Sequence, residues 1–546
     1  MEERDKNRMI DVKRLLAFTP FLFFLIFFYI LPLVFLIGNA SLTDFLSVVG
    51  DEYIHRLLNG TLIQAFLSML LTLLLALPVA FFFARYSFKG KRMLEYVLLT
   101  VFFVPAFTIA EGLIVLLGDN GIVNMFLSSL FGTGEPVIRI LYSMWAVVLA
   151  HVIYYVPLAV LILEQGFSSV DQDLVDAARV FSGSGLRTFK AAYLNTLTPF
   201  IVAASLLVFA FSFITYSTPI LVGGRFTTLE VEIYATKFRP ISSSIAIIQL
   251  SLTFLISIII ILFREKLFTK PSAGYPAEEP VSRLLSKPSG VLLIAYVAII
   301  YIFELAPVAM PVLKPFLEAG YDSLSLFKDL YSFKFGFGLS FNDVFFQSLA
   351  IAIIVSTVSV FLSIVMVWSS KILGGLFERT MSILMALPLT ISRSSLALGM
   401  LLSYGFGVIK LYGSWVLMVL GQSAFIIPLV VRIVEASWSR VIEEYREAAE
   451  VHGASLFFRL IRVEIPLVLP TLLASFLMAF SSSLSDFTFS TFFSTLNLMT
   501  LPVAVNILID SRRLSLALAL TSVITMLVII VETLGSQLSR ERLRVI

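Results

Sequence analysis

The chain alternates long apolar runs with short polar breaks. A run of roughly 20 apolar residues is long enough for an α-helix to cross a bilayer, and a helix satisfies its own backbone polar groups there. Twelve runs reach about this length. They predict spans near residues 15–38, 57–84, 93–117, 140–163, 198–222, 244–263, 289–313, 345–369, 379–403, 412–435, 467–487 and 515–535. The pattern therefore predicts an all-α polytopic membrane protein of about 12 transmembrane helices.

Composition supports this class and excludes several kinds of chemistry. Hydrophobic residues make up 59% of the chain and charged residues only 14%, which does not fit a soluble globular domain. No cysteine is present, so disulfides, thiolate metal sites and cysteine nucleophiles are excluded. The three histidines, His55, His151 and His452, are far apart in the sequence. We therefore expect no metal site and no cofactor bound by this chain.

Basic residues predict the orientation in the membrane. Lys and Arg concentrate in the N-terminal segment, in the loop between spans 2 and 3, in the segment between spans 6 and 7, and at the C-terminus. With twelve spans, these four segments lie on one side, and the positive-inside rule makes that side cytoplasmic. We expect a multi-pass protein of the plasma membrane with both termini in the cytoplasm, and the low net charge of +3 gives no sign of nucleic-acid binding.

The chain contains an internal repeat. Residues 264–288, rich in Pro, Gly, Ser and charges, are typical of a cytoplasmic linker, and they divide the chain into halves at 1–263 and 289–546 with about six spans each. An offset of 271 residues aligns the loop at 168–199 with the loop at 439–470. It pairs Asp176 with Glu447, the following two alanines in each copy, and Pro199 with Pro470. Repeats of equal orientation predict a pseudo-two-fold axis along the membrane normal.

Each loop is predicted to be a helix–turn–helix. Residues 441–451 favour a helix, Gly453 ends it, and a second short helix begins at Leu456. Pro466 is expected to mark the turn toward span 11, and Arg459 and Arg462 are expected to face lipid headgroups. An amphipathic loop resting on lipid is the alternative. A repeated carboxylate followed by two small residues favours a close-fitting protein groove instead.

The second loop resembles the EAA loop of binding-protein-dependent ABC importer permeases. Glu447-Ala448-Ala449, then Gly453, then Val463 to Pro466 stand at the spacing of that motif. The first copy departs from it, because Ser182 occupies the glycine position with Gly183 beside it and Ala192 to Asn195 replaces the usual closing residues. Two halves fused in one chain most resemble the ferric-iron and thiamine permeases.

This resemblance implies a function. It implies the type I ABC importer transmembrane fold, and a permease subunit that moves a small solute into the cytoplasm by alternating access. Ferric iron or thiamine is favoured as the solute, while polyamines and small oxyanions stay open. The implied partners are two copies of a cytoplasmic ABC ATPase subunit, an extracytoplasmic solute-binding protein and the lipid bilayer. ATP and Mg²⁺ would be bound by the ATPase, since the chain has no P-loop; Gly90-Lys91 precedes Arg92.

The resemblance also assigns roles to loop residues. Asp176 and Glu447 would pair with basic residues of the two ATPase subunits. Small side chains would allow the close approach, and Gly453 would make the turn. The complete predicted coupling set is Asp176, Ala177, Ala178, Ser182, Gly183, Glu447, Ala448, Ala449, Gly453 and Pro466.

Three ionisable residues are candidates for the translocation path, because charges within spans are costly and often functional. Glu111 follows Pro105 by six residues and Arg393 follows Pro388 by five, at nearly equivalent places in the two halves. We hypothesise that Glu111 and Arg393 face a central cavity and pair as a gate. Asp486 is the third candidate. The alternative for all three is a position near the outer interface.

Two other classes of protein are weighed against this reading. A gradient-driven secondary transporter also has twelve spans in parallel halves. Its usual Gly/Asp/Arg-rich loop between spans 2 and 3 is absent from ARYSFKGKRM, residues 84–93. An intramembrane enzyme would need paired aspartates, a Ser/His pair or an HExxH motif within its spans, and the spans contain none. Transport without catalysis of its own is therefore the expectation.

Overall fold

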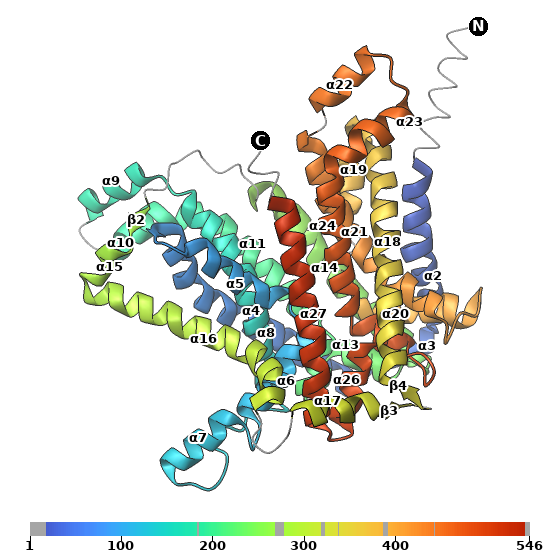
Figure 1. Ribbon diagram of the computed structural model, residues 1–546, viewed down its shortest axis with the longest axis horizontal. Helices are drawn as coiled ribbons and strands as arrows, with labels where there is room; N and C mark the ends of the chain where they lie inside the picture. Colours follow the sequence, from blue (N-terminus) through green and yellow to red (C-terminus); the bar gives the residue numbers. More distant parts are fainter. Residues whose placement is uncertain are drawn as a thin grey trace. The chain divides into compact units, whose positions relative to one another are not determined.

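Helices make up most of the part of the chain that the structure describes. The computed structural model describes residues 18–182, 185–267, 278–317, 323–336, 338–385, 391–441 and 443–540 (Figure 1). Among them, eleven helices are long and apolar enough to cross a membrane. The prediction of an all-α polytopic membrane protein is confirmed.

The elements of the first half and the linker follow in chain order, with η marking a π-helical turn. They are η1 Ile26–Ile30, α2 Leu31–Gly38, α3 Leu42–Gly50, α4 Glu52–Arg85, β1 Tyr86–Ser87, α5 Lys91–Phe103, α6 Ala106–Leu117, α7 Ile122–Phe131, α8 Met144–Ser168, α9 Gln172–Ser182, α10 Gly185–Thr188, η2 Phe189–Tyr193, α11 Leu194–Phe213, α12 Ser217–Val222, α13 Leu229–Ala235, α14 Ile241–Leu267, β2 Glu279–Pro280 and α15 Ser282–Leu285.

The second half has a matching series. Its elements are α16 Pro288–Leu317, α17 Ser323–Ser332, β3 Lys334–Phe335, β4 Leu339–Ser340, α18 Phe341–Leu373, α19 Gly375–Leu384, α20 Arg393–Met400, η4 Leu401–Gly407, α21 Trp415–Val441, α22 Glu443–Val451, α23 Leu456–Arg459, η5 Leu460–Glu464, α24 Ile465–Leu484, α25 Thr488–Phe493, α26 Leu501–Asp510 and α27 Leu514–Arg540.

Three predicted spans are not single helices among the described residues. The span at 198–222 is divided between the long helix α11, which ends at Phe213, and the short helix α12. The span at 93–117 breaks between α5 and α6, where Val104 is extended with ψ 143°. The cause is Pro105, because a proline disfavours helical backbone in the residue before it. The span at 379–403 is divided between α19 and α20, and residues 386–390 lie outside the described part. Hydropathy averages across such breaks, which explains why twelve uninterrupted spans were predicted.

The internal repeat is confirmed by the bounds of the elements. At the offset of 271 residues, η2 aligns with η5, α11 with α24, and α12 with α25, each with identical first and last positions. The two halves therefore repeat a π-helical turn, a long helix and a short helix in the same order. The match extends beyond the loops from which the repeat was inferred.

The chain forms two compact units that exchange segments between its halves. One unit contains Met1–Ser47, Ile233–Ile248 and Gly320–Ile546, and the other contains Val48–Glu232 and Gln249–Ala319. The first transmembrane helix therefore belongs with the second half, and α16 belongs with the first. The predicted boundaries at 263 and 289 describe the sequence repeat and stay a prediction.

In the unit of the first half, α4, α8, α11 and α16 enclose the core. Val79, Val156 and Leu197 are buried there together with Ile300 of α16. Gly112 of α6 lies directly against the backbone of Pro307, where an added Cβ would stand 1.8 Å from the carbonyl oxygen. Only glycine permits this approach of α6 to α16.

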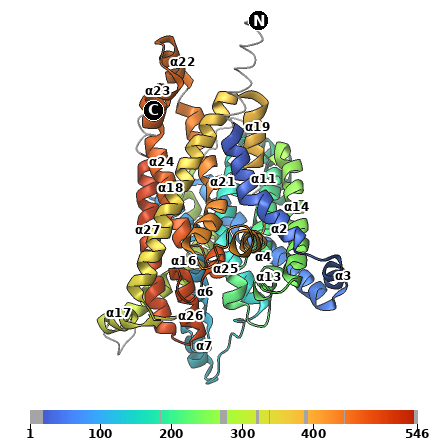
Figure 2. The same cartoon turned by 90° about the vertical axis from the view of Figure 1, so that its right-hand side faces the viewer.

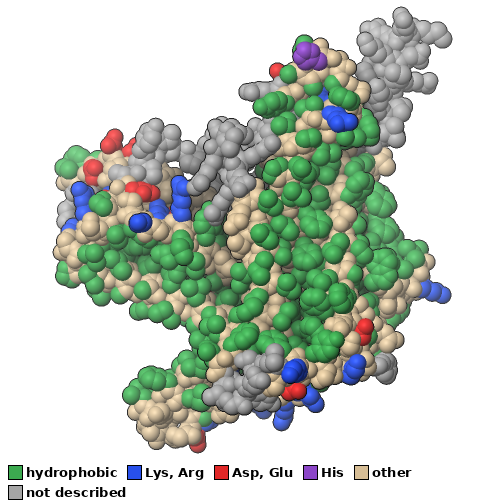
Figure 3. Space-filling view, viewed as in Figure 1, with side chains coloured by type: hydrophobic (Ala, Val, Ile, Leu, Met, Phe, Trp, Pro, Cys, Tyr) green, Lys and Arg blue, Asp and Glu red, His purple; other side chains and the backbone are tan. Residues whose placement is uncertain are grey.

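In the unit of the second half, α18, α21, α24 and α27 pack side by side (Figure 2). The N-terminal helix joins this group through backbone contacts. Tyr29 donates a hydrogen bond to the carbonyl oxygen of Ala424, and Tyr404 donates one of 2.5 Å to that of Phe27. Figure 3 shows hydrophobic side chains along the flanks of these helices, as expected for surfaces that face lipid.

Candidate functional site: two repeated coupling loops

The second loop, residues 439–470, presents its acidic and small residues to solvent. Glu447 and Ala448 lie exposed on α22, and Ala449 is half-buried. Gly453 lies in the turn after this helix with φ +76°, a left-handed conformation that glycine adopts without strain. Ser455 then caps α23 by accepting a hydrogen bond from the backbone N–H of Phe458 at 3.4 Å. The predicted helix–turn–helix is present, with its acidic helix exposed.

The first loop, residues 168–199, repeats this arrangement on α9. Asp176 and Ala177 are exposed, and Ala178 packs against the buried core of its unit. Asp176 accepts a hydrogen bond of 3.1 Å from Gln172 Nε2, one helical turn earlier. Ser182 is the last residue of α9, and Gly183 lies outside the described residues.

The chain does not turn at Pro466, and that prediction is wrong. α23, η5 and α24 form one continuous apolar helix from Leu456 to Leu484, with Pro466 in the first turn of α24. The π-helical turn immediately before the proline explains the continuity. Proline has no N–H to donate and its ring crowds the preceding turn, and the wider turn η5 accommodates both effects.

Arg459 does not face lipid headgroups, which corrects a second prediction. Its side chain is buried and donates through Nε to Glu464 Oε1 at 2.7 Å, and Glu464 is buried as well. Arg459 directly precedes the π-helical turn η5, and Glu464 is the last residue of that turn. At the equivalent positions of the first half stand Thr188 and Tyr193, both buried. Arg462 is exposed, as expected.

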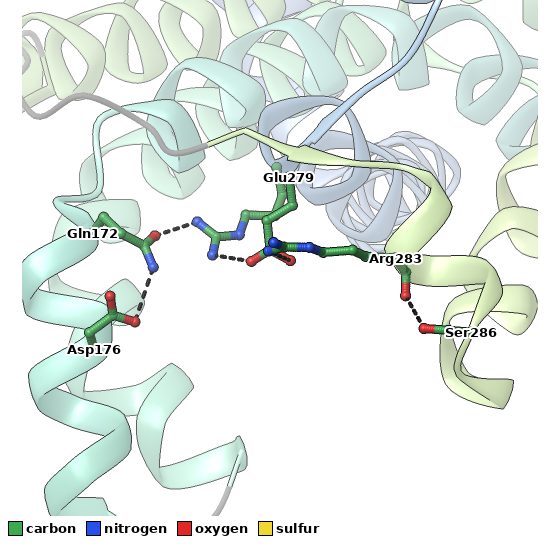
Figure 4. A network of polar contacts seen from close by, with 6 residues as sticks. Gln172, Asp176, Glu279, Arg283 and Ser286 are labelled. Carbon is green, nitrogen blue, oxygen red and sulfur yellow. Dashed lines mark hydrogen bonds and ion pairs between the residues drawn. The ribbon is translucent and has the colours of Figure 1, made fainter.

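A polar network ties the first loop to the linker, and the sequence analysis missed it. Arg85, the last residue of α4, donates to Gln172 of α9 through Nη1 and to Glu279 of the linker through Nη2, the latter at 2.7 Å. Figure 4 shows Gln172, Asp176 and Glu279 in this network, with Arg283 on the far side of Glu279. The signal in the sequence was Glu278-Glu279, a pair of adjacent acidic residues in a linker that contains more basic than acidic residues.

The second loop has a related basic anchor. Lys371, near the end of α18, donates to Ser439 Oγ at 2.8 Å and forms an ion pair with Glu378 of α19. Ser439 lies near the end of α21, where the second loop begins. In each half, therefore, a basic side chain at or near the end of a long helix contacts both the loop and an acidic partner.

The three candidates for the translocation path fall into different places. Glu111 is fully buried on α6. The Arg393 guanidinium lies 3.7 Å from the centre of the Phe425 ring, and Asp486 accepts a 3.0 Å hydrogen bond from the Ser490 backbone N–H. Glu111 belongs to one compact unit, whereas Arg393 and Asp486 belong to the other. Their role in translocation and the pairing of Glu111 with Arg393 stay predictions.

The duplicated helical bundle and its two exposed helix–turn–helix loops define a membrane transport component. Residues 73–269 and 359–544 match the family of the binding-protein-dependent transport system inner membrane component. The chain belongs to this family, one match falling in each half.

Several curated relatives align with the chain. The chain is 26% identical over 407 residues to the probable ABC transporter permease protein y4fN of Sinorhizobium fredii, covering 71% of this chain and 70% of the relative. It is 25% identical over 468 residues to the thiamine transport system permease protein ThiP of Brucella abortus, covering 83% and 82%. The spermidine/putrescine transport system permease protein PotB of Escherichia coli is 29% identical over 230 residues, which are 40% of this chain and 83% of PotB.

Proposed function

We propose that this chain is the transmembrane subunit of an ATP-driven importer, in which the two loops dock on two copies of a cytoplasmic ABC ATPase. The observation that carries the proposal is the repeated, exposed acidic helix, with Asp176 on α9 and Glu447 on α22 at equivalent positions. A carboxylate beside small side chains fits a groove lined with basic residues, because the backbone of the helix can approach closely while the charge is paired.

The proposed orientation follows from the loops. Both loops and both termini lie in the cytoplasm, and an extracytoplasmic binding protein delivers the solute to the opposite side. Closure of the ATPase dimer moves the loops, and the long helices that follow them carry this motion into the membrane. The solute then crosses by alternating access between inward-open and outward-open states.

Thiamine or ferric iron is the favoured solute. The thiamine permease of Brucella abortus aligns over most of both chains, whereas the polyamine permease PotB aligns with less than half of this one. Alignment over most of both chains supports a solute of the thiamine class. Ferric iron is favoured as well, because the fused halves also resemble the ferric-iron permeases. A polyamine or a small oxyanion is less favoured. The ligand that thermally stabilises the cognate binding protein would identify the solute.

The proposal is tested by purification and transport. We expect the tagged chain to co-purify with an ATPase identified by its P-loop and its ATP hydrolysis, and proteoliposomes holding both to take up solute only with ATP. Glu447→Arg should weaken ATPase retention by about tenfold or more, since a buried charge pair across an interface is worth a few kcal/mol. Exposed Arg462→Gln serves as the control and should retain the ATPase. Uptake without an ATPase that follows a proton or sodium gradient would instead establish a secondary transporter.

A further inference from the structure

We propose that the linker is part of the coupling apparatus of the first loop. The linker strap, defined as residues 278–285, holds α9 in position, with Glu279 acting through Arg85 and Gln172. This inference rests on the proposed function, and it assigns a positioning role to a segment that otherwise only joins two halves. Three sets of contacts support it.

The backbone of the linker strap is fixed to the first half. Glu279 and Pro280 pair as a short parallel strand with Tyr86 and Ser87, and the Val281 N–H donates to the Ser87 carbonyl oxygen at 3.1 Å. Leu284 of α15 is buried in the core of the same unit. A segment with ladder hydrogen bonds and a buried anchor has a defined place, unlike a flexible tether.

The side chains of the linker strap reach the coupling helix in two steps. The Arg85 side chain is only 11% exposed and that of Glu279 28%, so their 2.7 Å contact is shielded from water. Arg85 also donates to Gln172, and Gln172 donates to Asp176. The carboxylate of Glu279 thus orients the guanidinium, the guanidinium orients the amide, and the amide contacts the residue proposed to meet the ATPase. Lys91 Nζ of α5 and Glu278 Oε1 of the linker strap form a second ion pair, at 2.9 Å.

The second half shows what the linker strap replaces. There, Lys371 contacts the second loop at Ser439, and its acidic partner Glu378 comes from the same half, seven residues along the chain. In the first half, the acidic partner of Arg85 is 194 residues away in sequence. The linker therefore supplies to the first loop the carboxylate that the second loop receives locally.

The absence of cysteine allows a direct test by spin labelling of the full-length chain in nanodiscs. Val180 and Val451 are 80% and 85% exposed at the 271-residue offset, so Val180→Cys and Val451→Cys place matched labels on the two loops. Glu279→Gln should increase the mobility of the label at position 180 and leave that at 451 unchanged. Glu378→Gln should increase the mobility of the label at position 451 and leave that at 180 unchanged. Glu52→Gln, which removes an exposed ion pair, should change neither label.

Transport supplies the functional readout. With its ATPase, Glu279→Gln should lower solute uptake per ATP hydrolysed by about fivefold, the low end of typical coupling between sites. Gln172→Ala cuts the path while keeping the linker strap intact, and should mobilise the label at 180 in the same way. Unchanged mobility at 180 in both variants would overturn the inference, as would unchanged uptake per ATP. Failure of the wild-type chain to couple uptake to ATP would instead contradict the proposed function, since the label mobilities need no ATPase.

Discussion

At the scale of single residues, the buried pair of Arg459 and Glu464 is the feature that departs most from expectation. Glu464 follows Arg459 at a spacing of five positions, whereas side chains of an α-helix meet at spacings of three or four. Arg459 directly precedes the π-helical turn η5 and Glu464 is its last residue, and this turn brings the guanidinium and carboxylate to 2.7 Å. A charge pattern analysed for α-helical spacing cannot reveal such a pair.

Breaking this pair should destabilise the protein. Glu464→Gln leaves Arg459 buried without its carboxylate, and removing one partner of a buried pair costs roughly 3–5 kcal/mol. We expect a clearly lower melting temperature in detergent, with Arg459→Leu/Glu464→Leu recovering much of the loss. Arg462→Ala, at the exposed arginine beside the pair, is the control and should melt like the wild type. A Glu464→Gln melting curve that overlays the wild type would show that the pair contributes little.

Other residues behaved as the sequence predicted. The turn at Gly453 follows from a glycine placed between two helical patterns, and its positive φ agrees with that role. The exposure of Asp176 and Glu447 likewise follows from their position on polar helix faces. These predictions succeeded because each depends on local sequence alone. The contacts of Arg85 with Gln172 and Glu279 could not be predicted in this way, because they join segments that are far apart in the chain.

At the scale of elements, the contact of α6 with α16 depends on one missing side chain. Gly112→Ala would place a Cβ 1.8 Å from the Pro307 carbonyl oxygen, so the two helices must separate. Overpacking of this kind costs about 1–3 kcal/mol or more. We expect a lower melting temperature and reduced uptake. Gly535→Ala on α27, where the nearest atom is 3.5 Å away, is the matched control and should be neutral.

Hydropathy predicted where helices exist better than where they are interrupted. The apolar run through Pro105 continues on both sides, so composition alone gives one span, while backbone sterics divide it into α5 and α6. At Pro466 the error is the reverse: a turn was predicted, whereas the helix continues through the proline. Proline alone therefore does not determine whether a helix is interrupted. The helical geometry next to it, such as the π-helical turn η5, also matters.

At the scale of the whole molecule, the halves of the sequence are not the units of contact. The N-terminal helix packs on α20 and η4, with the Pro32 carbonyl against Gly399, and α16 packs on α6 and α4. The repeat was predictable because similar residues recur in the two halves at a fixed offset of 271 positions. The exchange of helices was not, because apolar helix surfaces look alike and do not specify which bundle they join.

This exchange predicts that neither half is stable alone. If the gene is divided within residues 268–277, each fragment contains helical segments that belong to the compact unit of the other half. These are Met1–Ser47 and Ile233–Ile248 in the first fragment and α16 in the second. We expect each fragment to be degraded when expressed singly, and both to accumulate and co-purify when expressed together. Immunoblots of membrane fractions with a tag on each fragment measure this. Stable accumulation of one fragment by itself would contradict the exchange.

The continuous helix that begins at Leu456 has a mechanical consequence. Its 29 residues make a helical lever roughly 44 Å long, at about 1.5 Å per residue. One end carries the second loop, and the helix continues from there through the π-helical turn η5, Pro466 and Pro470 to Leu484. A tilt of roughly 10° at the loop therefore displaces the far end of such a lever by about 8 Å, which is wider than a water molecule by severalfold. Under the proposed function, a small movement of the second loop would thus be enough to open or close a passage for a small solute.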